Sequence, residues 1–110
     1  MDEPGFEEGN FEAWPLHDAV AGSLCVDWVE RTCVLDLSVF FDPSQRARPA
    51  VVIWRSVRSV SLSRENPWGP SASVNDQRIE TDQTFVIEMQ SGDEIRVVAE
   101  SAQLLESSAA

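Results

Sequence analysis

His17 is the only histidine of the chain, and Asp18 follows it directly. A histidine beside a carboxylate can act as a general base. Neighbouring side chains of an extended segment point to opposite sides, so we expect Asp18 to be poorly placed to orient the imidazole. We therefore predict that His17 makes a structural hydrogen bond at the edge of the fold. The alternative is a small-ligand pocket or an active site that uses His17 with Asp18 or with a carboxylate on a neighbouring strand.

The other residues of the chain do not indicate a nucleophilic active site or a metal site. Cys25 and Cys33 lie in alternating apolar segments, where cysteine behaves as a small hydrophobic residue rather than as an activated thiolate. Two cysteines and one histidine are too few for a structural zinc site, and Asp27, Asp36 and Asp42 lack the spacing of a calcium loop. The chain has neither a Gly-x-Ser-x-Gly elbow nor a glycine-rich phosphate loop. We expect no catalytic residue, no metal and no cofactor, and we predict that the protein is not an enzyme.

A local basic patch follows Trp54 and consists of Arg55, Arg58 and Arg64. The planar guanidinium group suits carboxylates, so cross-strand pairing with acids such as Glu88 is one interpretation. Tryptophan and arginine are also frequent at the energetic centres of protein interfaces. We therefore include Trp54 and the three arginines among the candidate binding residues.

The segment 65–71, Glu-Asn-Pro-Trp-Gly-Pro-Ser, is a loop between two predicted strands. Its prolines cannot donate to a strand ladder, and Gly69 permits a turn that other residues resist. Trp68 either folds back as a lid on the core or stands out as a contact for a protein partner or a sugar ring. Trp68 and Gly69 are candidate binding residues on the second interpretation.

The charge of the chain is strongly negative, with 19 acids against 8 bases and a net charge of −11. This charge disfavours binding to nucleic acids and to anionic membranes, and it is compatible with a basic protein partner. No apolar run approaches the roughly 18 residues that a membrane helix needs, and the start of the chain does not resemble a secretory signal. We expect a cytoplasmic protein.

The acids are concentrated at the start, where residues 1–12 contain five acids and no base. We interpret residues 1–12 as a flexible acidic arm, residues 13–105 as a single β domain and residues 106–110 as a tail. One helical turn is possible at 101–105.

Two segments near the start of the predicted domain alternate apolar and polar residues with a period of two. A tight reversal centred on Glu30-Arg31 would pair Trp28 with Cys33 and continue along the strands as a hairpin. In this register Cys25 lies on the opposite face from Cys33. We therefore predict free thiols rather than a disulfide.

Three further strand signals follow in the second half. The region 51–63 changes phase, which predicts a bulge or bend near 56–59. A short strand at 73–75 and a polar link at 76–83 precede a second hairpin, in which a three-residue loop with Gly92 in a left-handed conformation would pair Met89 with Ile95. Together the signals predict an all-β fold, an antiparallel meander of five or six strands that forms a curved sheet or a partly open barrel with little helix.

Five different short motifs follow one another along the chain. They are Leu16-His17-Asp18-Ala19, Asp27-Trp28, Pro67-Trp68-Gly69-Pro70-Ser71, Val74-Asn75 and the run from Glu88 to Asp93. In this order the chain resembles, over residues 14–99, a group of small uncharacterised bacterial proteins with a mostly β fold and a Trp-Gly motif. Some members of that group are predicted to be immunity proteins of polymorphic toxin systems. The resemblance implies a toxin-neutralising or other binding role without known catalytic residues.

Three functional hypotheses remain. The first is a protein-binding module, such as an immunity protein that neutralises a basic toxin through its acidic surface. The second is a ligand-binding protein or enzyme that uses His17. The third is a structural homodimer that self-associates through a sheet edge or a tryptophan face.

Overall fold

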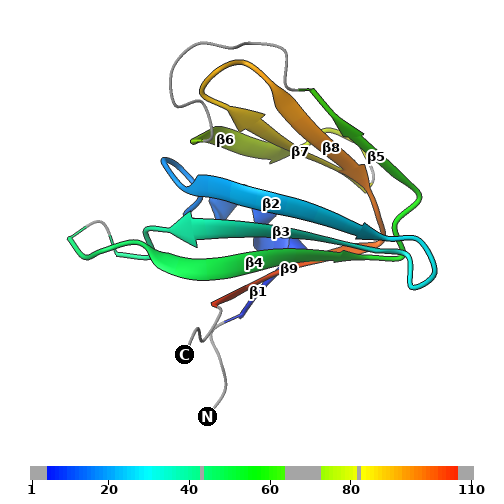
Figure 1. The fold of residues 1–110 in the computed structure, drawn as a ribbon, viewed down its shortest axis with the longest axis horizontal. Helices are drawn as coiled ribbons and strands as arrows, with labels where there is room; N and C mark the ends of the chain where they lie inside the picture. Colours follow the sequence, from blue (N-terminus) through cyan, green and yellow to red (C-terminus); the bar gives the residue numbers. More distant parts are fainter. Residues whose placement is uncertain (1–4, 43, 64–72, 82, 107–110) are drawn as a thin grey trace.

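Two antiparallel sheets form the protein, whose computed structural model describes residues 5–42, 44–63, 73–81 and 83–106 (Figure 1). The five-stranded sheet has the order β1-β9-β4-β3-β2 and the four-stranded sheet the order β5-β8-β7-β6. The first contains β1 (Gly5–Glu7), β2 (Val20–Asp27), β3 (Thr32–Val39), β4 (Arg48–Arg55) and β9 (Ser101–Glu106). The second contains β5 (Ser59–Leu62), β6 (Val74–Ile79), β7 (Thr84–Met89) and β8 (Glu94–Val98). The predicted all-β class with little helix is confirmed, although the sheets hold more strands than the five or six expected.

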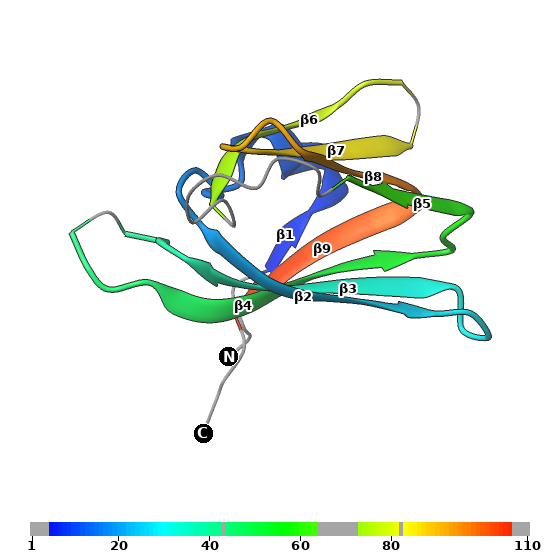
Figure 2. The ribbon, with the colours of Figure 1, turned by 45° about the horizontal axis from the view of Figure 1, so that its top comes forward.

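The core lies between the two sheets, because the inward side chains of both are apolar (Figure 2). From the five-stranded sheet come residues such as Leu35, Val52 and Leu104, and from the four-stranded sheet Ile87 and Val97, all at most 2% exposed. The described strands do not close into a barrel. Each sheet therefore has two outer strands, β1 and β2 in one and β5 and β6 in the other.

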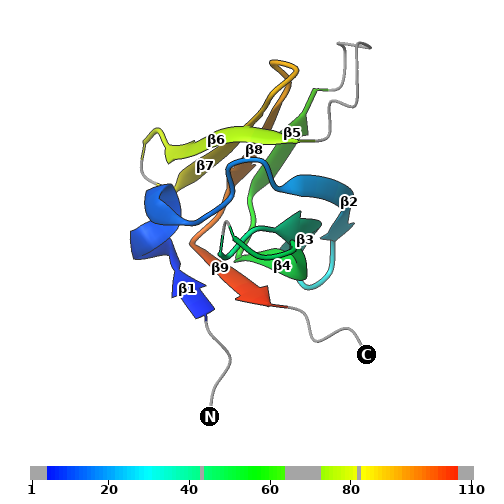
Figure 3. The same cartoon turned by 90° about the vertical axis from the view of Figure 1, so that its left-hand side faces the viewer.

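The acidic segment at the start of the chain is part of the fold, which corrects the prediction of a flexible arm for residues 5–12. Strand β1 pairs with β9, and the 3-10 helix η1 (Glu8–Ala13) follows it (Figure 3). Phe11 is fully buried and makes edge-to-face contacts with Trp14 and Phe85 at 4.8 and 5.0 Å between ring centroids. One buried aromatic ring thus outweighs the disordering effect of the acids around it.

A buried glutamine of β6 holds this segment in place. The Gln77 side-chain amide donates hydrogen bonds to the carbonyl oxygens of Phe11 (3.2 Å) and Trp14 (2.6 Å). Nearby, the Glu12 carboxylate accepts a hydrogen bond from the Ile79 backbone N–H at 2.9 Å. The buried position of Gln77 also explains why the predicted polar link at 76–83 is wrong over its first half, since residues 76–79 belong to β6.

The first hairpin differs from the predicted register by two residues. Val26, not Trp28, lies opposite Cys33, and Trp28 belongs to a turn that spans residues 28–31. The Asp27 side chain explains the longer turn, because its Oδ1 accepts hydrogen bonds from the N–H groups of Val29 (3.1 Å) and Glu30 (2.9 Å). A shift of two residues keeps every side chain on its predicted face.

The two cysteines lie on opposite faces of that hairpin as free thiols, as predicted. Cys25 is exposed and Cys33 is fully buried. Burial, with a smaller effect of Cys25, raises the pKa of Cys33 to about 11.

The predicted bend near 56–59 is confirmed, and the chain passes there from one sheet to the other. Strand β4 ends at Arg55 and β5 begins at Ser59, with Ser56 at a φ of 56° between them. The Val57 N–H donates to the carbonyl oxygen of Arg31 at 2.9 Å, which fixes the bend against the β2–β3 turn.

The C-terminal part contains one confirmed turn and three corrections. Gly92 has a φ of 97°, as predicted, but Ile87 rather than Met89 lies opposite Ile95. The predicted helical turn at 101–105 is wrong, because β9 pairs there with both β4 and β1. The predicted tail of residues 106–110 begins one residue too early for the same reason, since Glu106 belongs to β9, and 107–110 lie outside the described residues.

Candidate functional site

Of the candidate binding residues predicted from the sequence, one is buried and three lie outside the described residues. Arg64, Trp68 and Gly69 lie outside the described residues. Trp54 is fully buried in the core, which contradicts its assignment to a binding surface. The cause is its place in β4, between β3 and β9, where its side chain faces the opposite sheet.

Arg55 and Arg58 form no ion pair with the acids among the described residues, unlike the predicted pairing. The guanidinium of Arg55 donates to Oε1 of Gln103 at 3.1 Å, and that of Arg58 to Oε1 of Gln83 at 2.8 Å. Glu88 instead lies 3.8 Å from Arg78. The bend at Ser56 separates the two arginines, because Arg55 ends β4 of one sheet and Arg58 directly precedes β5 of the other.

His17 makes the structural hydrogen bond that the sequence predicts. Its Nδ1–H donates to the carbonyl oxygen of Asn75 at 2.9 Å. Asp18 has a φ of 68°, and its Oδ1 lies 3.7 Å from Nε2 of His17, which is beyond hydrogen-bond distance, so the carboxylate does not orient the imidazole. Both side chains are more than half exposed, and Gln90 also donates to this carboxylate at 2.7 Å.

These two residues border a hollow of about 580 Å³, which we call the His17 hollow. It is lined by Glu12, Trp14, Pro15, His17, Asp18, Phe40, Asn75, Asp76 and Gln77. The lining includes three carboxylates but no serine, cysteine or lysine, so it suits a cation better than nucleophilic chemistry. No group of three or more metal-ligating side chains occurs within the described ranges.

A larger groove of about 880 Å³ lies between the outer strands of the two sheets, and we call it the β2–β5 groove. It is lined by Leu24, Val26, Asp27, Trp28, Arg31, Thr32, Val57, Arg58, Ser59, Val60 and Leu62. A smaller hollow shares Leu24 and Leu62 with it and continues along β2 to Ala21. The sequence pattern did not reveal this groove, because alternation marks the inward face of a strand but not which strand ends the sheet.

Large apolar side chains of the β2–β5 groove are open to solvent. Trp28 is 87% exposed, Leu62 55% and Val26 44%. Val26 lies on the inward face of β2, but the opposite sheet ends at β5 and does not cover it. Exposed apolar surface of this kind, lining one concavity, is typical of binding sites.

The backbone along the groove is also unpaired on one side. Among the described residues, strands β2 and β5 each have a neighbour on one edge only, apart from an isolated bridge between Val20 and Ser73. In an antiparallel pair only alternate residues exchange hydrogen bonds with the neighbour, so the others turn N–H and C=O groups to the free edge. Such an edge is a template for another extended chain.

Charge at the groove is basic at one end. Arg31 and Arg58 line it next to Trp28, and neither forms an ion pair in the part of the chain that the structure describes. Asp27 also lines this end, but its Oδ1 already accepts two backbone hydrogen bonds of the turn.

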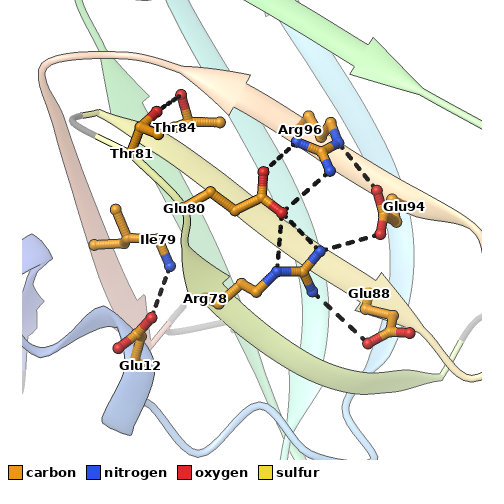
Figure 4. A network of polar contacts seen from close by, with 9 residues as sticks. All are labelled: Glu12, Arg78, Ile79, Glu80, Thr81, Thr84, Glu88, Glu94 and Arg96. Carbon is orange, nitrogen blue, oxygen red and sulfur yellow. Dashed lines mark hydrogen bonds and ion pairs between the residues drawn. The ribbon is translucent and has the colours of Figure 1, made fainter.

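The largest charged cluster lies elsewhere, on the outer face of the four-stranded sheet (Figure 4). Arg78 and Arg96 there bond the carboxylates of Glu80 and Glu94 at 2.7–3.2 Å. Hydrogen bonds, first from Arg96 and then from Arg78, lower the pKa of Glu80, and the same contacts raise the pKa values of both arginines. The charges of this cluster largely satisfy one another, so we assign it to sheet stability rather than to binding.

Comparison with models of protein families, with curated protein sequences and with solved structures gave no match. No described helix has the length and apolar character to cross a membrane.

Proposed function

We propose that the protein is a binding module that takes up an extended apolar segment of a partner protein in the β2–β5 groove. The observation that carries this proposal is the exposed Trp28, which lies with Val26 and Leu62 along the groove. Covering these side chains would remove apolar surface from water, at about 25 cal/mol per Å². A tryptophan in such a position is a frequent energetic centre of an interface.

A polypeptide fits the groove better than a small apolar ligand. A lipid or similar molecule could cover Trp28 and Leu62, but it would leave the edges of β2 and β5 without hydrogen-bond partners and away from water. An extended chain supplies both apolar side chains and backbone groups. Toxin neutralisation, as the resemblance to immunity proteins implies, is the specific form of this proposal, and it requires no catalysis.

The test begins with a display library of random peptides of about ten residues, a length that spans a strand of ordinary size. We expect selection against the protein to yield apolar peptides, and Trp28→Ala to weaken their binding about tenfold or more in calorimetric titrations. Val29→Ala is the control, because Val29 has the same 87% exposure in the same turn but does not line the groove. Selected peptides that bind Trp28→Ala and Leu62→Ala as tightly as the natural protein would reject the groove as the binding site.

A second candidate function is supported by the carboxylates of the His17 hollow. Glu12, Asp18 and Asp76 line it beside the ring of Phe40, a combination that suits a guanidinium or ammonium group of a basic partner. The probe is a short arginine peptide. We expect binding that weakens with salt and with Asp76→Asn, and that is unchanged in Glu30→Gln, whose carboxylate lies in the β2–β3 turn. Equal affinity for both variants would reject the hollow as a cation site.

A further inference from the structure

We propose that the partner segment binds as an additional strand on the free edge of β2 and extends the five-stranded sheet, with its acidic end beside Arg31 and Arg58. This inference rests on the proposed function and names its binding mode. The occupant is an extended protein segment whose alternate residues are apolar and whose one end carries carboxylates.

The length of the two edges favours β2 over β5. Strand β2 has eight residues and β5 only four, and short edge strands are a common protection against added chains. Strand β2 contributes residues from Ala21 to Asp27 to the lining of the β2–β5 groove and its continuation. Strand β5 contributes residues only from Ser59 to Leu62. An added strand therefore finds its longer template on β2.

The part of β2 next to the groove is regular and unprotected. Leu24 to Asp27 pair with β3 residue by residue, and the irregularity of the strand lies before them, between Ala21 and Leu24. The stretch contains neither proline nor lysine, the residues that most often prevent strand addition, and its only charge is at Asp27. Leu24–Asp27 thus form the flat part of this edge, which continues past the irregularity to Ala21.

Side chains of an added strand would follow the alternation of the sheet. Every second one would lie on the inward face beside Leu24 and Val26, opposite Leu62 of β5. Apolar residues at these positions would cover the surface that is now exposed, and the intervening residues would face solvent. This periodicity explains why we specify alternate rather than continuous apolar residues.

The charges set the direction of the occupant. The chain as a whole has a net charge of −11, yet Arg31 and Arg58, which form no ion pair with any described residue, border the Trp28 end of the groove. A carboxylate at that end of the occupant would meet a guanidinium group, whereas a basic residue would be repelled.

The binding mode is tested with the peptide of highest affinity from the display selection. Amide hydrogen exchange is followed by NMR with and without the peptide. We expect two alternate amides among Leu24–Asp27 to exchange about tenfold more slowly in the complex, while the amides of Ser59–Leu62 change little. N-methylation of the peptide, one residue at a time, should weaken binding at every second position only, because only alternate N–H groups face β2.

A second experiment tests which end of the bound segment carries the carboxylates. Moving the carboxylates to the other end of the peptide should weaken binding about fivefold or more, and Arg31→Gln with Arg58→Gln should remove most of that difference. Unchanged affinity of the reversed peptide would overturn the proposed direction.

Other results would overturn strand addition but leave the proposed function intact. Peptide binding that depends on Trp28 but tolerates N-methylation at all positions would show a groove filled by side chains alone. Protection of the β5 amides, or sensitivity at every position, would place the occupant on β5 or on both edges. A dimer in sedimentation experiments that the peptide dissociates would identify a second copy of the chain as the occupant. Loss of the dependence on Trp28 would instead reject the proposed function itself.

Discussion

Trp28 and Trp54 have opposite environments, with 87% and 0% exposure. Trp54 lies in a strand with neighbours on both edges, so its side chain is covered by the facing sheet. Trp28 lies in the turn after an outer strand, where no second sheet reaches it. The proposed binding surface depends on this difference of position rather than on residue type.

The two cysteines also differ in burial, and this difference predicts their reactivity. Burial raises the pKa of Cys33 to about 11, so near neutral pH almost none of it is the reactive thiolate. We expect a thiol reagent to modify the exposed Cys25 at once in the folded protein and to modify Cys33 only after denaturation. Mass spectrometry of the natural protein and of Cys25→Ser would give the two rates. Equal rates in the folded state would contradict the buried position of Cys33.

Strands β6, β7 and β8 are connected on their outer face by the arginine and glutamate cluster. Arg78 of β6 and Arg96 of β8 both lie opposite Val86 of β7, and Val86 is fully buried although it is outside the main core. The arginine stems flank Val86 from both sides, and Glu80 bonds both guanidinium groups across it. The cluster therefore explains how a charged stretch forms a strand.

The arginine and glutamate cluster of the four-stranded sheet predicts how the stability of the protein changes at low pH. The hydrogen bonds from Arg96 and Arg78 hold the pKa of Glu80 below its ordinary value of 4.5. A lowered pKa contributes stability above the unfolded value, and that contribution is lost as the pH falls through the folded pKa. We expect Glu80→Gln to lower stability at neutral pH and to flatten the loss of stability below pH 4.5. Urea denaturation across this range would measure both effects, with Glu30→Gln as the control; identical pH profiles would contradict the role of Glu80.

In the whole molecule, the acidic start of the chain contributes Phe11 to the common core. Phe11 fills the core beside Trp14 and Phe85, so Phe11→Ala should lower the free energy of unfolding by about 3–5 kcal/mol. Phe40, which is 36% exposed, is the control, and its replacement by alanine should cost about 1 kcal/mol or less. A single unfolding transition with unchanged stability in Phe11→Ala would restore the interpretation of residues 5–12 as an arm.

Structural features that depend on only a few neighbouring residues could be predicted from the sequence. The alternation of β3, the bend near Ser56 and the left-handed Gly92 follow from local backbone geometry, and all three are present. The hairpin registers were wrong by two residues because their turns are fixed by hydrogen bonds such as that from Val29 N–H to Asp27, which alternation does not reveal. Only the start of β6 was predicted, as a strand at 73–75, because charged residues in and directly after its second half form ion pairs with side chains of β8.

The sequence by itself determined that this is an all-β protein and which side chains face inward, because the side-chain period of a strand is a local property. Only the tertiary structure decided which strands end the sheets, since that depends on pairings between segments far apart in the chain. The exposure of Trp28, the burial of Trp54 and the β2–β5 groove all follow from those pairings.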